Sequence, residues 1–138
     1  MDTYTPFRGG EGVAFHDGRV YFTTKGDNRV WWYDVVDREL GLLYDRDTSD
    51  QPILSGVDNV TITPAGDVLV AEDGGDMQLV VLSPDGKVVP LLQVMGHDRS
   101  EICGPAFDPA FQRMYFSSQR GSEGVATGGI TYEITHRA

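Results

Sequence analysis

The sequence predicts an all-β fold made of β-propeller blades. Residues 12–24, 59–72 and 104–118 each hold a short apolar run, a turn rich in Gly, Pro or Asp, and a second apolar run. The starts of these hairpins lie 47 and 45 residues apart. A hairpin that recurs at this spacing is typical of a propeller, whose blades are four-stranded sheets of about 40–50 residues. The 138 residues hold about three blades, and closed propellers have roughly 4–8, so we expect a fragment or a half that closes by association.

Each expected blade follows from its own runs and turns. Blade one spans about 11–45, blade two about 57–92, and blade three about 103–135, which lacks a fourth strand. The strands of blade one are expected at 13–15, 19–23, 28–34 and 40–44. Those of blade two are expected at 60–63, 68–71, 77–82 and 88–92, and those of blade three at 106–107, 114–117 and 130–134. Continuous apolar runs such as Leu79–Leu82 indicate sheets that are covered on both faces.

Composition excludes several classes of function. The net charge of −10 and the isoelectric point near 4.5 argue against nucleic acid, whose phosphates require Lys and Arg, and against an anionic membrane surface. No apolar run approaches the roughly 18 residues of a membrane span. The first residues do not form the charged-then-apolar pattern of a signal sequence, and a longer parent protein would carry any such signal elsewhere. The single Cys103 excludes an internal disulfide. The excess of Asp and Glu is explained either by a solvated surface or by binding of a divalent cation.

Carboxylates gather on one predicted face of the propeller. Connectivity puts the crossovers between blades and the loops after each second strand on the same face. Glu11, Asp58 and Cys103 share one repeat position there, near the mouth of the central channel, and Glu72 stands where the other blades carry Thr24 and Ser118. Converging carboxylates repel one another unless a cation neutralises them, and oxygen ligands of this kind suit Ca²⁺. The alternatives are solvated turn caps at Glu11 and Asp58, and a small buried residue at Cys103.

Three strings carry a resemblance to a known family. They are Gly10-Glu11-Gly12 with residues 20–31, Asp58-Asn59-Val60 with residues 64–74, and Glu101 with residues 104–109 and 114–121. Together they resemble the C-terminal part of the PhoX-like alkaline phosphatases, also described as a bacterial domain of unknown function. The resemblance implies a six-bladed propeller, of which this chain would form part or half, in a usually exported protein. Family members with activity hydrolyse phosphate monoesters at a calcium and iron cluster on the propeller axis, so the implied ligand is a small phosphate ester.

The resemblance also implies which residues bind metal. It carries this role to Glu11 and Glu72, which match the family's Glu-Gly and Glu-Asp motifs, and extends it to Asp58 and Glu101. The family's Arg-Pro-Glu-Gly appears here as Gly9-Gly10-Glu11-Gly12, so the Arg and Pro differ. The remaining ligands would come from other blades, so we expect little or no activity from this chain alone, and no catalytic residue is assigned.

Two other functions fit the same residues. In a gluconolactonase-like propeller, Glu11, Asp58 and Asn59 would surround a single Ca²⁺. In a non-catalytic propeller module, the chain would serve as a binding or scaffold unit. In every case we expect apolar blade faces at both ends of the arc. Because exposed apolar patches usually mark an interface, we expect a second copy or the missing blades of the propeller to cover them.

Overall fold

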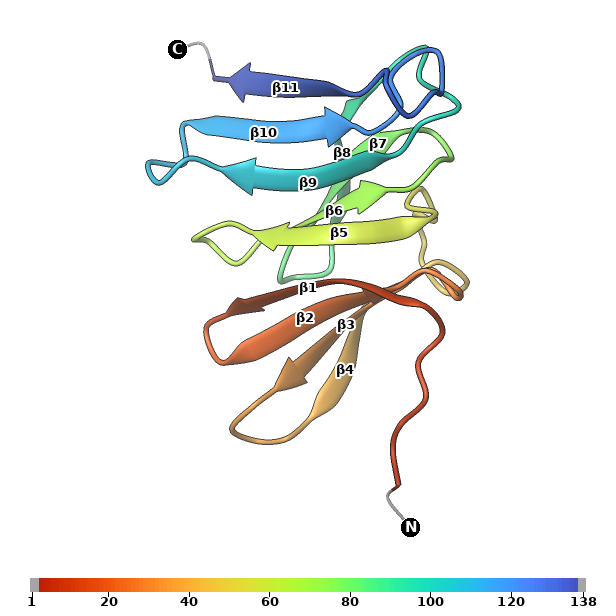
Figure 1. Cartoon of the computed structure of the whole chain (residues 1–138). Coiled ribbons are helices and arrows are strands. Elements are labelled where there is room, and N and C mark those ends of the chain that lie inside the picture. The colour runs from red at the N-terminus through yellow and green to blue at the C-terminus, as the bar shows by residue number, and fades with distance from the viewer. Residues whose placement is uncertain (1–2, 137–138) are drawn as a thin grey trace.

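The computed structural model describes residues 3–136 as three antiparallel sheets with no helix in that range (Figure 1). In each sheet the spatial order of the strands follows the chain, so every sheet is a meander. Blade one contains β1 (Gly10–His16), β2 (Arg19–Thr24), β3 (Arg29–Asp34) and β4 (Leu40–Asp45). Blade two contains β5 (Val57–Ile62), β6 (Val68–Glu72), β7 (Gln78–Leu82) and β8 (Val88–Gln93), and blade three contains β9 (Ile102–Phe107), β10 (Arg113–Ser118) and β11 (Ile130–Thr135). The all-β prediction is confirmed.

The first strand of every blade begins earlier than the apolar pattern predicts. β1 begins at Gly10, β5 at Val57 and β9 at Ile102, each several residues before the expected apolar run. Irregular pairing explains the difference, because the register of all three strands shifts near their starts. A β-bulge breaks the alternation of buried and exposed residues, which is the signal that sequence reasoning uses. The polar residues at these bulges therefore belong to strands and not to loops.

Two apolar layers hold the three blades together. β6 is buried along its whole length, with alternate side chains entering alternate layers. One layer joins blades one and two, and the other joins blades two and three. The first contains Val30, Tyr44, Leu54, Val57, Val68, Val70, Val80 and Leu82, and the second contains Leu69, Ala71, Met77, Leu79, Ile102, Met114 and Phe116. Full burial of one such side chain stabilises the fold by about 1.5–3 kcal/mol, so blade two anchors its neighbours.

The two ends of the arc differ in chemistry. Side chains that point away from blade two form the outer face of each terminal blade, and strand pairing identifies them, since directly paired residues share a side. The outer face of blade one holds Val13, Phe15, Phe22, Trp31, Leu40 and Leu42. The outer face of blade three holds Cys103, Ala106, Tyr115, Ser117, Thr131 and Glu133. The expectation of apolar faces at both ends is therefore wrong for blade three, where polar residues occupy the third strand.

In the described part of the chain, no helix is long and apolar enough to span a membrane.

Candidate metal centre

The first strands of the three blades lie next to one another, with β5 between β1 and β9 (Figure 1). In β1 the register shifts between Gly10 and Val13, and in β5 between Val57 and Val60. The shift in β9 falls one residue later, between Cys103 and Ala106. The residues paired with Thr24, Glu72 and Ser118 are Gly10, Val57 and Ile102, so Glu11, Asp58 and Cys103 follow at equivalent places.

Neighbouring bulges contact each other directly. A Cβ atom at Gly12 would lie 2.6 Å from the carbonyl oxygen of Asp58, so the two backbones can approach this closely only at glycine. The hydroxyl of Thr23 accepts a 2.9 Å hydrogen bond from Gly12 N–H and donates a 2.5 Å bond to the Asp58 carbonyl. Asn59 Oδ1 accepts a 2.6 Å bond from Gly104 N–H in blade three. These contacts fix the three bulges relative to one another.

Three carboxylates converge beside the bulges. Asp58, Asp73 and Glu101 are partly buried, and one oxygen of each lies within 4.8 Å of the others. We call these three residues the acidic cluster. Two basic side chains contact it. Lys25 pairs with Asp73, and Arg120 Nη2 lies 3.5 Å from Glu101 Oε2. Three negative charges against two positive ones leave the acidic cluster with an excess of negative charge.

Burial and neighbouring charges shift the pKa of two groups in this region. Burial raises the pKa of Asp58, the charge of Glu11 raises it further, and the charge of Lys25 opposes both. Burial also raises the pKa of the Cys103 thiol, followed by the charges of Glu101 and Asp58. The cost of holding several charged carboxylates in a partly buried place is what a bound cation relieves.

Glu72 has a different role in the structure. Its side chain is fully buried, and Oε1 accepts a 2.8 Å bond from Ser55 N–H while Oε2 accepts a 2.9 Å bond from Gln78 N–H. Burial raises the pKa of Glu72, and these two backbone bonds oppose the rise. The carboxylate therefore ties the crossover before β5 and the loop before β7 to the end of β6.

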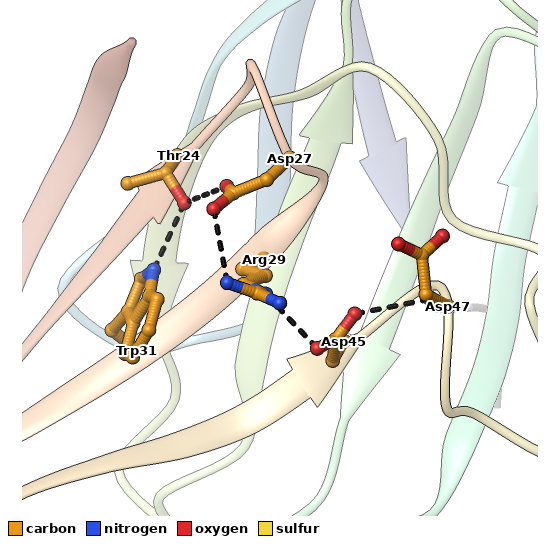
Figure 2. Close-up of polar contacts among 6 residues, drawn as sticks. All are labelled: Thr24, Asp27, Arg29, Trp31, Asp45 and Asp47. Carbon is orange, nitrogen blue, oxygen red and sulfur yellow. Dashed lines mark hydrogen bonds and ion pairs between the residues drawn. The ribbon is translucent and has the colours of Figure 1, made fainter. Parts of the chain in front are cut away.

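Thr24 occupies the equivalent position in blade one, and its hydroxyl also holds the adjoining loop. Thr24 Oγ1 accepts a 2.9 Å bond from Trp31 Nε1 and donates a 2.5 Å bond to Asp27, as Figure 2 shows. Arg29 continues the network, since its Nε donates a 2.9 Å bond to Asp45 Oδ2 (Figure 2). The loop after β2 is thus held by hydrogen bonds between side chains. The loop after β6 is held by hydrogen bonds from backbone N–H groups to the Glu72 carboxylate.

Blade three uses a serine at this position. Ser118 Oγ lies 2.7 Å from His97 Nδ1 and 2.8 Å from Ser100 Oγ, and all three residues are buried. Position 72 therefore has a structural explanation: in each blade the last residue of the second strand is a buried polar group that secures the adjoining loops. We call Thr24, Glu72 and Ser118 the strand-end locks.

The predicted ligands thus fall into three groups. Asp58 and Glu101 come together in the acidic cluster. Glu11 is exposed and lies close enough to Asp58 to influence its pKa. Glu72 serves as a strand-end lock, and within residues 3–136 neither Glu11 nor Glu72 belongs to the acidic cluster. Asp73 is not among the predicted ligands, although the loop after the second strand of blade two, where it lies, belongs to the predicted face. Metal binding itself stays a prediction.

The geometry defines a class of protein: an arc of propeller blades that carries an acidic cluster beside its first strands. Solved structures support the fold. A luciferin-regenerating enzyme matches with 20% identity and a TM-score of 0.69, over 92% of this chain and 45% of that one. Virginiamycin B lyase from Staphylococcus aureus matches with 16% identity and a TM-score of 0.60, over 94% and 42%. A chain of the nidogen/laminin complex matches with 15% identity and a TM-score of 0.65, over 90% and 47%.

These three matches show that the fold is propeller-type, and the chain spans less than half the length of each. No protein of curated function matches this chain. The model of the family described as alkaline phosphatase PhoX matches residues 22–121. The chain therefore belongs to the alkaline phosphatase PhoX family, as its motifs predicted.

Proposed function

We propose that this chain supplies part of a metal-dependent phosphomonoesterase propeller and binds calcium at Asp58, Asp73 and Glu101, with Glu11 as a nearby fourth carboxylate. The observation that carries the proposal is the convergence of three partly buried carboxylates on one side of the first strands. Membership of the PhoX family supports phosphate monoesters as the substrate class. The family match extends through Gln119 and Arg120, and so covers the residues of the acidic cluster.

The donor set fits a hard cation. Calcium takes six to eight oxygen ligands, and three convergent carboxylates provide several of them, leaving room for waters or other ligands. Cys103 offers a softer ligand beside the same cluster, and iron accepts such a ligand more readily than calcium does. We propose calcium as the principal ion and iron as a second metal, the latter on family resemblance.

The chain's own residues would share the work with the metal. A bound cation would polarise a phosphoryl oxygen and stabilise the charge that develops during hydrolysis. Lys25 and Arg120 already contact the acidic cluster, so a cation that neutralises Asp73 and Glu101 would free both side chains to hold a phosphate dianion. Arg suits this task, because its planar guanidinium can bind two phosphate oxygens. The interlocked bulges would keep Asp58 in place while the cation binds.

The surroundings of the protein follow from the same proposal. We propose an exported protein, because the chain resembles a family that is usually exported. A second copy of the chain is the partner we propose, and a small phosphate ester is the ligand. We expect weak activity from the arc alone.

Metal content separates the candidate functions. Elemental analysis of the purified protein should find calcium with iron if the phosphatase proposal is right. A single calcium without iron would favour the lactonase-like alternative, and no metal at all would favour a non-catalytic module. Hydrolysis of p-nitrophenyl phosphate, measured with and without added calcium and iron, then tests the activity directly.

Matched variants locate the site. Asp73→Asn keeps the size of the side chain and removes one charge from the acidic cluster, so it should reduce bound calcium. Glu39→Gln removes one charge from an exposed position outside the cluster and should leave the calcium content unchanged. Equal calcium in both variants would contradict the proposed ligand set.

A further inference from the structure

The side chain of Lys25 lies among the carboxylates of the acidic cluster. Lys25 belongs to the loop after β2 in blade one, and it pairs with Asp73 in the loop after β6 of blade two. Its charge also opposes the rise in the pKa of Asp58. Lys25 therefore acts on two of the three carboxylates of the cluster, and it does so from a neighbouring blade.

The two basic side chains of the site differ in how closely they are held. Lys25 and Asp73 are in direct contact, and both side chains remain partly exposed. Arg120 Nη2 lies 3.5 Å from Glu101 Oε2, which is longer than the roughly 2.7–2.9 Å of a strong hydrogen bond between charged groups. Lys25 is therefore the closer counter-ion of the cluster, and a cation bound by Asp73 must displace it.

The backbone on both sides of this ion pair is fixed by other bonds. Lys25 N–H donates a 2.8 Å hydrogen bond to the Gly9 carbonyl. Asp73 N–H donates a 2.7 Å bond to the Gly56 carbonyl, and Gly56 N–H donates a 2.6 Å bond to Asn28 Oδ1. These bonds do not involve the side chain of Lys25. The ion pair can therefore open by rotation of side chains, and a substitution at Lys25 should leave both loops in place.

We propose, building on the function proposed above, that Lys25 is an internal counter-ion that calcium displaces from Asp73 and that then binds the phosphate of the substrate. Three carboxylates against two basic side chains give the calcium-free site a net negative charge, which repels a phosphate dianion. The two charges of Ca²⁺ reverse this sign and release the lysine. Calcium and phosphate ester should therefore strengthen each other's binding, and such coupling is reciprocal.

Lys25 thus has opposite effects on the two ligands. In the calcium-free chain it competes with the cation for Asp73, so its removal should tighten calcium binding. In the calcium-bound chain it contributes a positive charge to the phosphate, so its removal should weaken phosphate binding. A residue that only stabilised the fold would not change the two affinities in opposite directions.

Isothermal titration calorimetry of the chain with calcium tests this coupling. Phenylphosphonate, which resembles a phosphate monoester and cannot be hydrolysed, should tighten calcium binding by about fivefold or more in mildly alkaline buffer. Without it, Lys25→Met should bind calcium about twofold to fivefold more tightly than the unmodified chain, and phenylphosphonate should then add less than about twofold. Lys87→Met is the matched control, because Lys87 pairs with Asp85 in the turn between β7 and β8. It should behave like the unmodified chain.

Two results would overturn the inference and leave the calcium site in place. One is calcium binding that is unchanged or weaker in Lys25→Met, which would show that the lysine does not compete with the cation. The other is a phenylphosphonate effect that is absent from the unmodified chain or equally large in Lys25→Met. A lack of calcium binding in all three proteins would contradict the proposed function itself. Circular dichroism confirms that each variant is folded, and Lys25→Gln replaces Lys25→Met if methionine disturbs the loop.

Discussion

Two sets of carboxylates lie at the same edge of the blades and differ in what surrounds them. Glu72 is fully buried and each of its oxygens accepts a backbone hydrogen bond. Asp58, Asp73 and Glu101 remain partly open to solvent, and each has other carboxylates as neighbours. The comparison shows that a carboxylate on the same face can be committed to the fold by backbone hydrogen bonds. Glu72 is committed in this way, whereas Asp73 and Glu101 pair only with the side chains of Lys25 and Arg120. We therefore propose the acidic cluster, and not Glu72, as the metal site.

The largest expected effect comes from Glu72. Glu72→Leu removes both acceptors and leaves the N–H groups of Ser55 and Gln78 buried without a partner, at about 1–3 kcal/mol each. We expect a loss of about 2–6 kcal/mol in the free energy of unfolding, measured by urea denaturation. Glu72→Gln keeps one acceptor and should lose roughly half as much. A leucine variant as stable as the unmodified chain would show that position 72 is not a lock.

Gly12→Ala should disturb the acidic cluster without changing a charge. The new Cβ atom would overlap the backbone of Asp58 in the neighbouring blade, and a backbone atom cannot rotate away. We expect a loss of about 1–3 kcal/mol in the free energy of unfolding, together with weaker calcium binding. Gly18→Ala offers a control, because a Cβ atom there meets no neighbour within 4 Å. That position has a positive φ of 77°, so its own strain should lower stability but leave calcium binding unchanged.

The smallest expected change in stability comes from Asp58→Asn. This substitution should raise the free energy of unfolding, whereas Glu72→Leu and Glu72→Gln should lower it. Burial and the charge of Glu11 raise the pKa of Asp58 above its ordinary value of 3.8. A carboxyl group whose pKa is higher in the folded state stabilises the fold below the pKa of the unfolded state, and this contribution is lost as pH rises through the folded pKa. Without calcium, Asp58→Asn should therefore gain stability over the unmodified chain as pH rises above about 4, by less than about 1 kcal/mol.

Thermal unfolding of both proteins from pH 3.5 to 7 in a chelator would measure this difference. A variant that loses stability relative to the unmodified chain across the same range would show that Asp58 is stabilised as an anion even without a cation.

The sequence predicted the fold well because the repeat leaves two independent signals, apolar runs and turn residues, at a constant spacing. It predicted the starts of β1, β5 and β9 less well, since their bulges carry polar residues that resemble loops. The site was predicted in part. Asp58 and Glu101 could be chosen from motifs, but the burial of Glu72 depends on Ser55 and Gln78, whose backbone positions only the folded chain determines. Asp73 joins the acidic cluster through the path of the loop after β6, which no local pattern specifies.

Calcium-dependent thermal stability tests the central claim most directly. A ligand that binds only the folded chain raises its stability, by about 2.7 kcal/mol at a concentration one hundred times the dissociation constant. The melting temperature should rise with calcium in the unmodified chain and in Glu72→Gln, and should rise much less in Asp73→Asn. No rise in the unmodified chain, or a rise that Glu72→Gln abolishes and Asp73→Asn retains, would contradict the assignment of the acidic cluster as the metal site.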